Sequence, residues 1–124
     1  MQKNSLTLSW TNLTGRMTGD TTKTALEQYP VGGIVYFAQN MESKDQVKEM
    51  IDNSQSYSKV GLFISTDEEG GMVNRLMNTV GTTYIDSMYN YKDEGTQKAH
   101  DNAYTIASDM AARIFPWTIP GLQK

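Results

Sequence analysis

The sequence predicts an α/β fold built on a parallel sheet. Two nearly continuous apolar runs, residues 31–37 and 60–66, are typical of parallel strands that are covered on both faces. The segment between them carries apolar residues at helical spacing, so strand, helix and strand alternate along the chain. This alternation favours right-handed crossovers within one sheet. Because an eight-stranded α/β barrel takes about 250 residues, a chain of 124 residues supplies about half of one.

Before the first apolar run, the sequence predicts a strand and a helix. Residues 5–10 alternate apolar and polar side chains, which is typical of a half-buried strand. Asp20 is expected to cap a helix over residues 21–29, which Pro30 ends because its ring disfavours helical geometry in the preceding residue. The buried face of this helix is expected to carry Thr22, Ala25, Leu26 and Tyr29.

A second helix is predicted between the two apolar runs. Ser43 and Gln46 have the spacing of a capping box, with Ser43 as the N-cap. The residues that follow at helical spacing are Val47, Met50, Ile51, Ser54 and Tyr57. Gly32 and Gly33, at the start of the first run, are interpreted as allowing close packing of a helix on the strand.

The last third of the chain has weaker patterns. Residues 85–89 fit a single helical turn within an otherwise irregular stretch, and residues 96–113 fit a longer helix. The apolar face of that helix is expected to carry Ala99, Ala103, Ile106, Ala107 and Met110. Residues 113–124, with Pro116 and Pro120, are expected to form an irregular tail. One domain over residues 1–124 is expected.

Composition excludes several classes of protein. The net charge of −3 with mixed signs gives no basic surface for a nucleic acid. No apolar run approaches the roughly 20 residues that span a bilayer, so no membrane partner is expected. The absence of cysteine excludes disulfides and thiolate chemistry. The first residues lack the apolar stretch of a signal peptide, so a cytoplasmic location is the default expectation.

The strongest chemical signal is an acidic group at the end of the second apolar run. Asp67, Glu68 and Glu69 follow the run and precede Gly70 and Gly71. The carboxyl ends of parallel strands are where α/β proteins bind ligands. A carboxylate there can accept hydrogen bonds from sugar hydroxyls, hold Mg²⁺ or accept a phosphoryl group. The alternative is a solvated acidic turn, because acids at strand ends are common.

Other residues also have more than one interpretation. Gly70 and Gly71 permit positive φ and close backbone approach. Arg75 can contact a ligand oxygen through two nitrogens, or form an exposed ion pair with Glu68 or Glu69. His100, next to Asp101 on the predicted last helix, is interpreted as a surface histidine.

Two segments resemble one known family. Residues 29–40, YPVGGIVYFAQN, resemble its VGGIILFxxN segment, and residues 62–75, LFISTDEEGGMVNR, resemble its LFIAVDEEGGxVxRL segment. The helix between the two has fitting length. The chain is similar over residues 20–110 to glycoside hydrolase family 3, in particular to its β-N-acetylhexosaminidases.

This resemblance implies a partial (β/α)8 TIM barrel and hydrolysis of β-linked N-acetylglucosamine. The family's motif aspartate and closing arginine bind the sugar in the −1 subsite, and they correspond to Asp67 and Arg75. Glu68, Glu69, Gly70 and Gly71 are motif and turn residues. No cofactor and no metal are expected. The resemblance implies a glycan containing N-acetylglucosamine as the partner.

The catalytic groups of the family have no match in the chain. Its acid/base histidine and its nucleophilic aspartate lie in later segments, and His100 does not correspond to that histidine. A fragment that is inactive alone is therefore expected. The alternatives are a non-enzymatic half-barrel that forms a homo-oligomer, most simply a dimer burying the inner sheet face, and a receiver-like domain using Asp67 and Glu68 with Mg²⁺.

Overall fold

A computed structural model describes residues 20–114, and the chain divides into two compact units between Thr66 and Asp67. The first unit contains α1 (Asp20–Gln28), β1 (Gly33–Tyr36), η1 (Ala38–Asn40), α2 (Lys44–Tyr57) and β2 (Phe63–Thr66). The second contains β3 (Glu68–Gly70), β4 (Val73–Asn74) and α3 (Gly95–Arg113). The predicted strand at residues 5–10 and the predicted tail from residue 115 lie outside the described residues. One domain over residues 1–124 stays a prediction.

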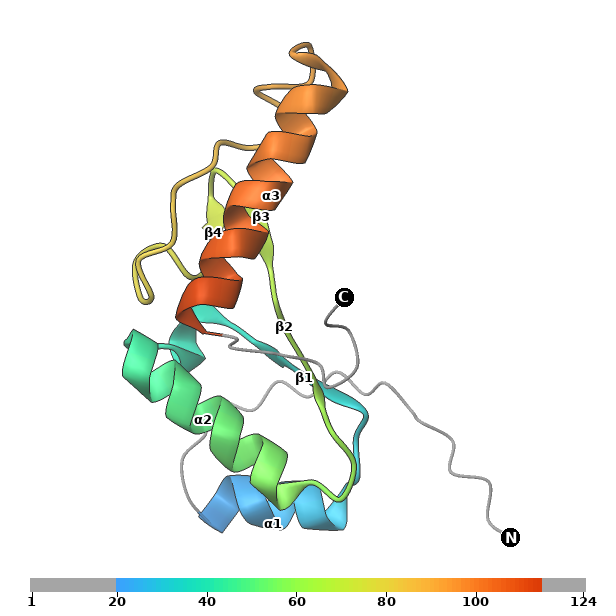
Figure 1. Ribbon diagram of the computed structural model, residues 1–124. Coiled ribbons are helices and arrows are strands. Elements are labelled where there is room, and N and C mark those ends of the chain that lie inside the picture. The colour runs from blue at the N-terminus through green and yellow to red at the C-terminus, as the bar shows by residue number, and fades with distance from the viewer. Residues whose placement is uncertain (1–19, 115–124) are drawn as a thin grey trace, which may run out of the picture. The chain divides into compact units, whose positions relative to one another are not determined.

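The first unit is a strand–helix–strand crossover (Figure 1). Strands β1 and β2 pair in parallel, with Gly33 opposite Phe63 and Tyr36 opposite Thr66. Helix α2 connects them, and α1 packs against α2. The prediction of parallel strands with alternating helices is therefore confirmed, and the sheet of the described residues is not a closed barrel.

Gly33 is required by the neighbouring strand rather than by a helix. A Cβ atom built on Gly33 would lie 2.7 Å from the backbone oxygen of Phe63, closer than real Cβ contacts come. The interpretation that Gly33 allows helix–strand packing is corrected on this point. The close approach involves β2, with which Gly33 is in register.

Helix α2 begins as its sequence predicts. The backbone N–H of Gln46 donates to the Ser43 hydroxyl at 3.3 Å, so Ser43 is the N-cap. The Gln46 side chain accepts from the backbone N–H of Glu42 at 3.0 Å, one residue before the position that an ideal capping box uses. The buried face of α2 carries Val47, Met50, Ile51 and Ser54, as predicted.

A buried pair of hydroxyls links β1 to α2. The Ser54 hydroxyl donates to the backbone oxygen of Met50 at 2.8 Å, so its lone pairs remain for the Tyr36 hydroxyl at 3.0 Å. Burial raises the pKa of Tyr36, and this hydroxyl therefore stays a donor. Because an unpaired buried hydroxyl is costly, this pair specifies how helix and strand meet.

Strand β2 is less buried than its apolar sequence predicts. The side chain of Gln55 accepts from the Leu62 N–H and donates to its carbonyl, both at 2.9 Å, which fixes the entry to β2. Phe63 is nevertheless 73% exposed, and only β1 is buried along most of its length.

On α1, Thr22 and Leu26 are buried as predicted, whereas Tyr29 lies beyond the end of the helix and is exposed.

The second unit contains a hairpin that the sequence pattern did not reveal. Strands β3 and β4 pair antiparallel, with Glu68 opposite Asn74 and an irregularity in register between Glu68 and Gly70. The helical turn expected at residues 85–89 is wrong, since residues 85–87 are irregular and turns follow over residues 88–93. Each strand of the hairpin is too short to show a period, and this explains the miss.

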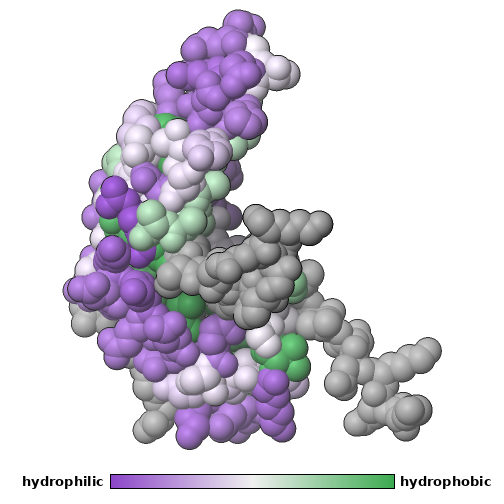
Figure 2. Space-filling model, in the orientation of Figure 1, coloured by the Kyte–Doolittle hydropathy of each residue, from purple (hydrophilic) through white to green (hydrophobic). Residues whose placement is uncertain are grey.

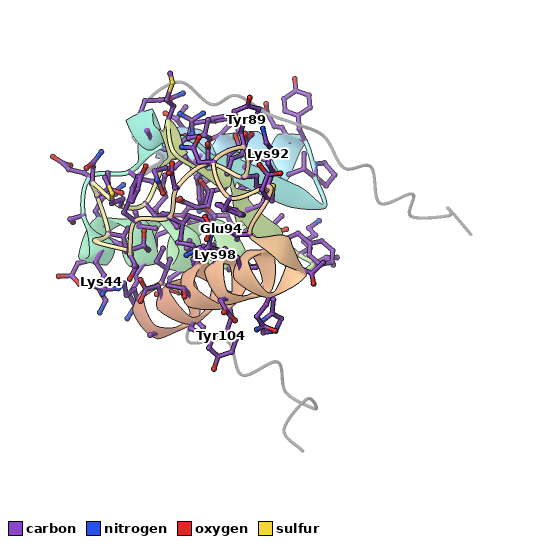
Figure 3. The ribbon with its side chains drawn as sticks, turned by 90° about the horizontal axis from the view of Figure 1, so that it is seen from above. Lys44, Tyr89, Lys92, Glu94, Lys98 and Tyr104 are labelled. Atoms are coloured by element: carbon purple, nitrogen blue, oxygen red, sulfur yellow. The ribbon has the colours of Figure 1, made fainter. Side chains whose placement is uncertain are left out.

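Helix α3 confirms the prediction for residues 96–113 in its position. Of the expected apolar face only Ile106 is buried, and Ala99, Ala103 and Ala107 are exposed. Figure 2 shows a hydrophilic surface at the N-terminal end of α3, and Tyr104 projects from the helix into solvent (Figure 3). No helix among residues 20–114 has the length and apolar character needed to cross a bilayer.

Candidate functional site

The candidate site lies on the β3–β4 hairpin and the residues at its two ends. Asp67 directly follows the last residue of β2 in the chain, and Arg75 directly follows β4. A guanidinium Nη2 of Arg75 lies 4.0 Å from Asp67 Oδ2, with 31% of the arginine side chain and 40% of the aspartate side chain exposed. The sequence predicted these two residues as a pair, and the hairpin brings them together. Arg75 thus forms an ion pair with Asp67, and its charge also acts on Glu68, one of the two partners expected in the alternative.

The distance between Asp67 and Arg75 matters chemically. At 4.0 Å the two charged groups attract each other without forming a short hydrogen bond. Half-exposed groups of opposite charge present acceptors and donors to the same volume of solvent. Such a pair suits a neutral ligand with neighbouring hydroxyl groups, because a hydroxyl both donates and accepts.

Glu68 is the inward carboxyl of the acidic group. Its Oε1 accepts from the backbone N–H of Leu76 at 2.5 Å, and its Oε2 is buried without a hydrogen-bond partner. Burial raises the pKa of Glu68, while hydrogen bonds from the Leu76 and Arg75 backbones and the charge of Arg75 oppose that rise. Its neighbour Glu69 is exposed, as the alternation of side chains along a strand requires.

The two glycines of the hairpin turn are fixed by their surroundings. Gly70 and Gly71 have φ of 83° and 59°, in the left-handed region that favours glycine. A Cβ atom on Gly70 would lie 2.2 Å from the backbone oxygen of Asp86, and the Gly71 N–H donates to the Ile85 carbonyl at 3.0 Å. Both properties that the sequence suggested, positive φ and close backbone approach, are present.

In the segment that follows the hairpin in the chain, the Asp86 carboxylate holds nearby residues by hydrogen bonds. It accepts from the Ser87 N–H at 2.7 Å and from the Asn90 amide at 2.8 Å through each oxygen. These bonds, led by that from Asn90, lower the pKa of Asp86. In the same segment, Lys92 lies over the ring of Tyr89, with its Nζ 4.0 Å from the ring centroid (Figure 3).

Sequence reasoning missed the role of Asp86, because its partners lie within a stretch that has no periodic pattern. The signal available was local: aspartate followed by serine and asparagine at short spacing is typical of side chains that bind nearby backbone.

His100 has no contact with Asp67 or Arg75 among its described interactions. It is an exposed residue of α3, with its Nδ1 3.3 Å from Asp101 Oδ1 and its ring stacked on Tyr104. This agrees with its interpretation as a surface histidine. Within residues 20–114, no group of three or more histidine, aspartate or glutamate side chains is placed to hold a metal ion.

Comparisons with known proteins all point to the same family. The sequence model of the family described as glycosyl hydrolase family 3 N-terminal domain matches residues 5–119. A beta-hexosaminidase of Haemophilus influenzae is 30% identical over 87 residues, which are 66% of this chain and 24% of that protein. One of Methylobacillus flagellatus is 35% identical over 87 residues, again covering 24% of its length. The chain thus spans about a quarter of the length of these relatives.

Solved structures agree on the fold. A family 3 beta-N-acetylglucosaminidase from Paenibacillus sp. str. FPU-7 superposes with a TM-score of 0.68 and 29% identity, covering 86% of this chain and 20% of that one. NagZ from Neisseria gonorrhoeae gives a TM-score of 0.65 at 23% identity, with 81% of this chain and 32% of that one covered. The prediction of a partial (β/α)8 barrel is confirmed. This chain belongs to glycoside hydrolase family 3 and represents part of its N-terminal domain.

Proposed function

We propose that the chain carries part of the sugar-binding site of a family 3 glycosidase acting on β-linked N-acetylglucosamine. The observation that carries the proposal is the pairing of Asp67 with Arg75 at 4.0 Å, half exposed at the open end of the hairpin. Both residues stand at the motif positions to which the family resemblance assigns sugar contacts. The beta-hexosaminidase and beta-N-acetylglucosaminidase names of the relatives support the choice of sugar.

The two side chains make different hydrogen bonds to the sugar. The Asp67 carboxylate accepts hydrogen bonds from sugar hydroxyls, and a carboxylate forms stronger hydrogen bonds than a neutral acceptor. The Arg75 guanidinium donates to hydroxyl oxygens in a fixed planar geometry. Because one group only accepts and the other only donates, together they fix the orientation of a hydroxyl pair.

Calorimetric titration with N-acetylglucosamine tests this site. Asp67→Asn removes the charge at a half-exposed position, and Glu69→Gln removes the same charge from the exposed neighbour on the same hairpin. We expect Asp67→Asn to weaken binding about tenfold or more, equivalent to one charge-assisted hydrogen bond, and Glu69→Gln to have little effect. Equal loss in both variants would indicate a general charge effect and would argue against a specific contact at Asp67.

The 124 residues by themselves are proposed to bind sugar without hydrolysing it. Retaining glycosidases need a nucleophile and an acid/base on either side of the glycosidic bond. The resemblance matches neither group to a residue of this chain. With a chromogenic β-N-acetylglucosaminide, the purified chain should give no turnover above a heat-inactivated sample. Turnover that disappears on Asp67→Ala would overturn this part of the proposal.

A second candidate function is a non-enzymatic half-barrel that associates with itself. The observation that favours it is the exposure of Phe63 on β2 and of Val60 just before it, at 73% and 61%. A parallel strand with exposed apolar side chains is a surface suited to a second copy. Light scattering over a range of concentrations should show a dimer that Phe63→Glu dissociates. A particle of 13.9 kDa at high concentration would exclude it.

A further inference from the structure

Glu68 occupies a position that links the two ends of the candidate site. It follows Asp67 directly in the chain, and its carboxylate reaches across the hairpin to the backbone at Arg75 and Leu76. The register opposite Asn74 brings Glu68 next to the residue that precedes Arg75. One carboxyl group on β3, next to Asp67 in the chain, is therefore bonded to the backbone that follows β4, next to Arg75.

We infer that Glu68 is a positioning residue, which holds Arg75 in place for ligand contact by accepting the backbone N–H of Leu76, the residue that follows Arg75. The inference rests on the proposed function, because the ligand in question is the sugar that Asp67 and Arg75 contact. Glu68 itself is not proposed to touch the sugar. Its Oε2 is buried and its Oε1 is engaged by backbone, so neither oxygen is presented to solvent as the Asp67 carboxylate is.

The reach of Glu68 has a physical consequence for Arg75. The long arginine side chain loses rotamer freedom when it binds a ligand, and that loss weakens binding. A backbone fixed next to Arg75 by the hydrogen bond from Leu76 to a charged acceptor restricts where the guanidinium can lie. The irregular register between Glu68 and Gly70 supports this reading, since bulges re-aim side chains beside functional sites.

Variants at Glu68 separate positioning from simple packing. Glu68→Ala removes the acceptor, and Glu68→Asp keeps the charge but withdraws the carboxylate by one methylene group. Glu68→Gln keeps an oxygen at the Oε1 position and should therefore preserve both the position of Arg75 and the affinity for the sugar. Ser43→Ala removes the cap of α2 in the other unit, and it serves as a control for loss of stability alone.

The first readout is the Nε–H signal of Arg75 in the ¹⁵N spectrum of the sugar-free chain, assigned by its loss in Arg75→Lys. We expect the signal to shift and broaden in Glu68→Ala and Glu68→Asp, and to stay in place in Glu68→Gln and Ser43→Ala. An unchanged signal in Glu68→Asp would overturn the inference, and this remains decisive if Glu68→Ala does not fold.

The second readout is affinity for N-acetylglucosamine. Loss of hydrogen bonds to a charged group predicts about tenfold weaker binding in Glu68→Ala and Glu68→Asp, with Glu68→Gln close to the unsubstituted chain. Affinity lost equally in Glu68→Gln would contradict the role of the Oε1 acceptor. If the unsubstituted chain binds no sugar, the proposed function fails, and the Arg75 signal alone decides whether Glu68 positions that residue.

Discussion

At the scale of single residues, the hairpin shows how three adjacent acids come to differ. Asp67 is half exposed beside Arg75, Glu68 turns inward to bind backbone, and Glu69 faces solvent. Alternation along the strand separates the last two, and burial raises the pKa of Glu68. Three adjacent carboxyl groups therefore differ in what they contact, because their side chains point in different directions.

The raised pKa of Glu68 predicts a pH dependence of stability. Because the folded state binds this proton more tightly than the unfolded state, protonation favours folding, and Glu68 contributes relatively more stability at low pH. The melting temperature of the unsubstituted chain, minus that of Glu68→Gln, should rise from about pH 7 to about pH 4. Thermal unfolding of both proteins at the two pH values measures it. A difference that falls over this range would show that the folded pKa is lowered instead.

The turn glycines give a sharper prediction. Gly70→Ala places a Cβ in a left-handed backbone conformation and against the Asp86 carbonyl. We expect a loss of at least about 2 kcal/mol in the free energy of unfolding, since left-handed geometry alone costs about 1–2 kcal/mol. Chemical denaturation measures this loss.

Gly61→Ala is the control, because a Cβ there meets no atom within 4 Å. It should change stability by less than about 1 kcal/mol. Similar losses in the two variants would mean that the close approach at Gly70 has no energetic weight.

At the scale of elements, the strand–helix–strand crossover in the first unit follows from patterns that are visible in the sequence. Ser43 caps α2, Val47, Met50 and Ile51 form its buried face, and β1 and β2 pair in parallel. Helical period, cap and apolar runs all point to the same arrangement, and agreement of this kind is typical of a sequence that specifies one fold.

The N-cap of α2 supplies a prediction for this scale. Ser43→Ala leaves the Gln46 N–H without its side-chain acceptor and should cost about 1 kcal/mol of stability. Ser56→Ala, at an exposed position near the end of the same helix, should be close to neutral. Thermal unfolding of the two variants decides it. A neutral Ser43→Ala would show that water replaces the cap at no cost.

The elements of the second unit were harder to predict, for physical reasons. Strands β3 and β4 contain three and two residues, which is too short for a period to appear. The segment after them is held by the Asp86 carboxylate and by backbone contacts to Gly70 and Gly71, none of which leaves a periodic signal. Conversely, β2 has the composition of a buried strand, but Phe63 is exposed, because burial depends on what covers a strand.

At the scale of the whole molecule, the site was easier to foresee than the geometry that supports it. Asp67 and Arg75 were predicted together because the acid follows an apolar strand and the motif has a fixed spacing. The role of Glu68 needed the hairpin register, which brings its carboxylate to the backbone at Leu76. Family membership follows from the match over residues 5–119, whereas the proposed sugar site rests on the few residues of the hairpin.

The central claim is that the hairpin of this family 3 chain binds N-acetylglucosamine. The most direct measurement is the change in backbone amide shifts of the ¹⁵N-labelled chain during titration with that sugar. We predict saturable shifts concentrated on residues 67–76, which are absent in Asp67→Asn and kept in Glu69→Gln. Saturable shifts located elsewhere, or shifts on the hairpin that survive Asp67→Asn unchanged, would contradict the claim.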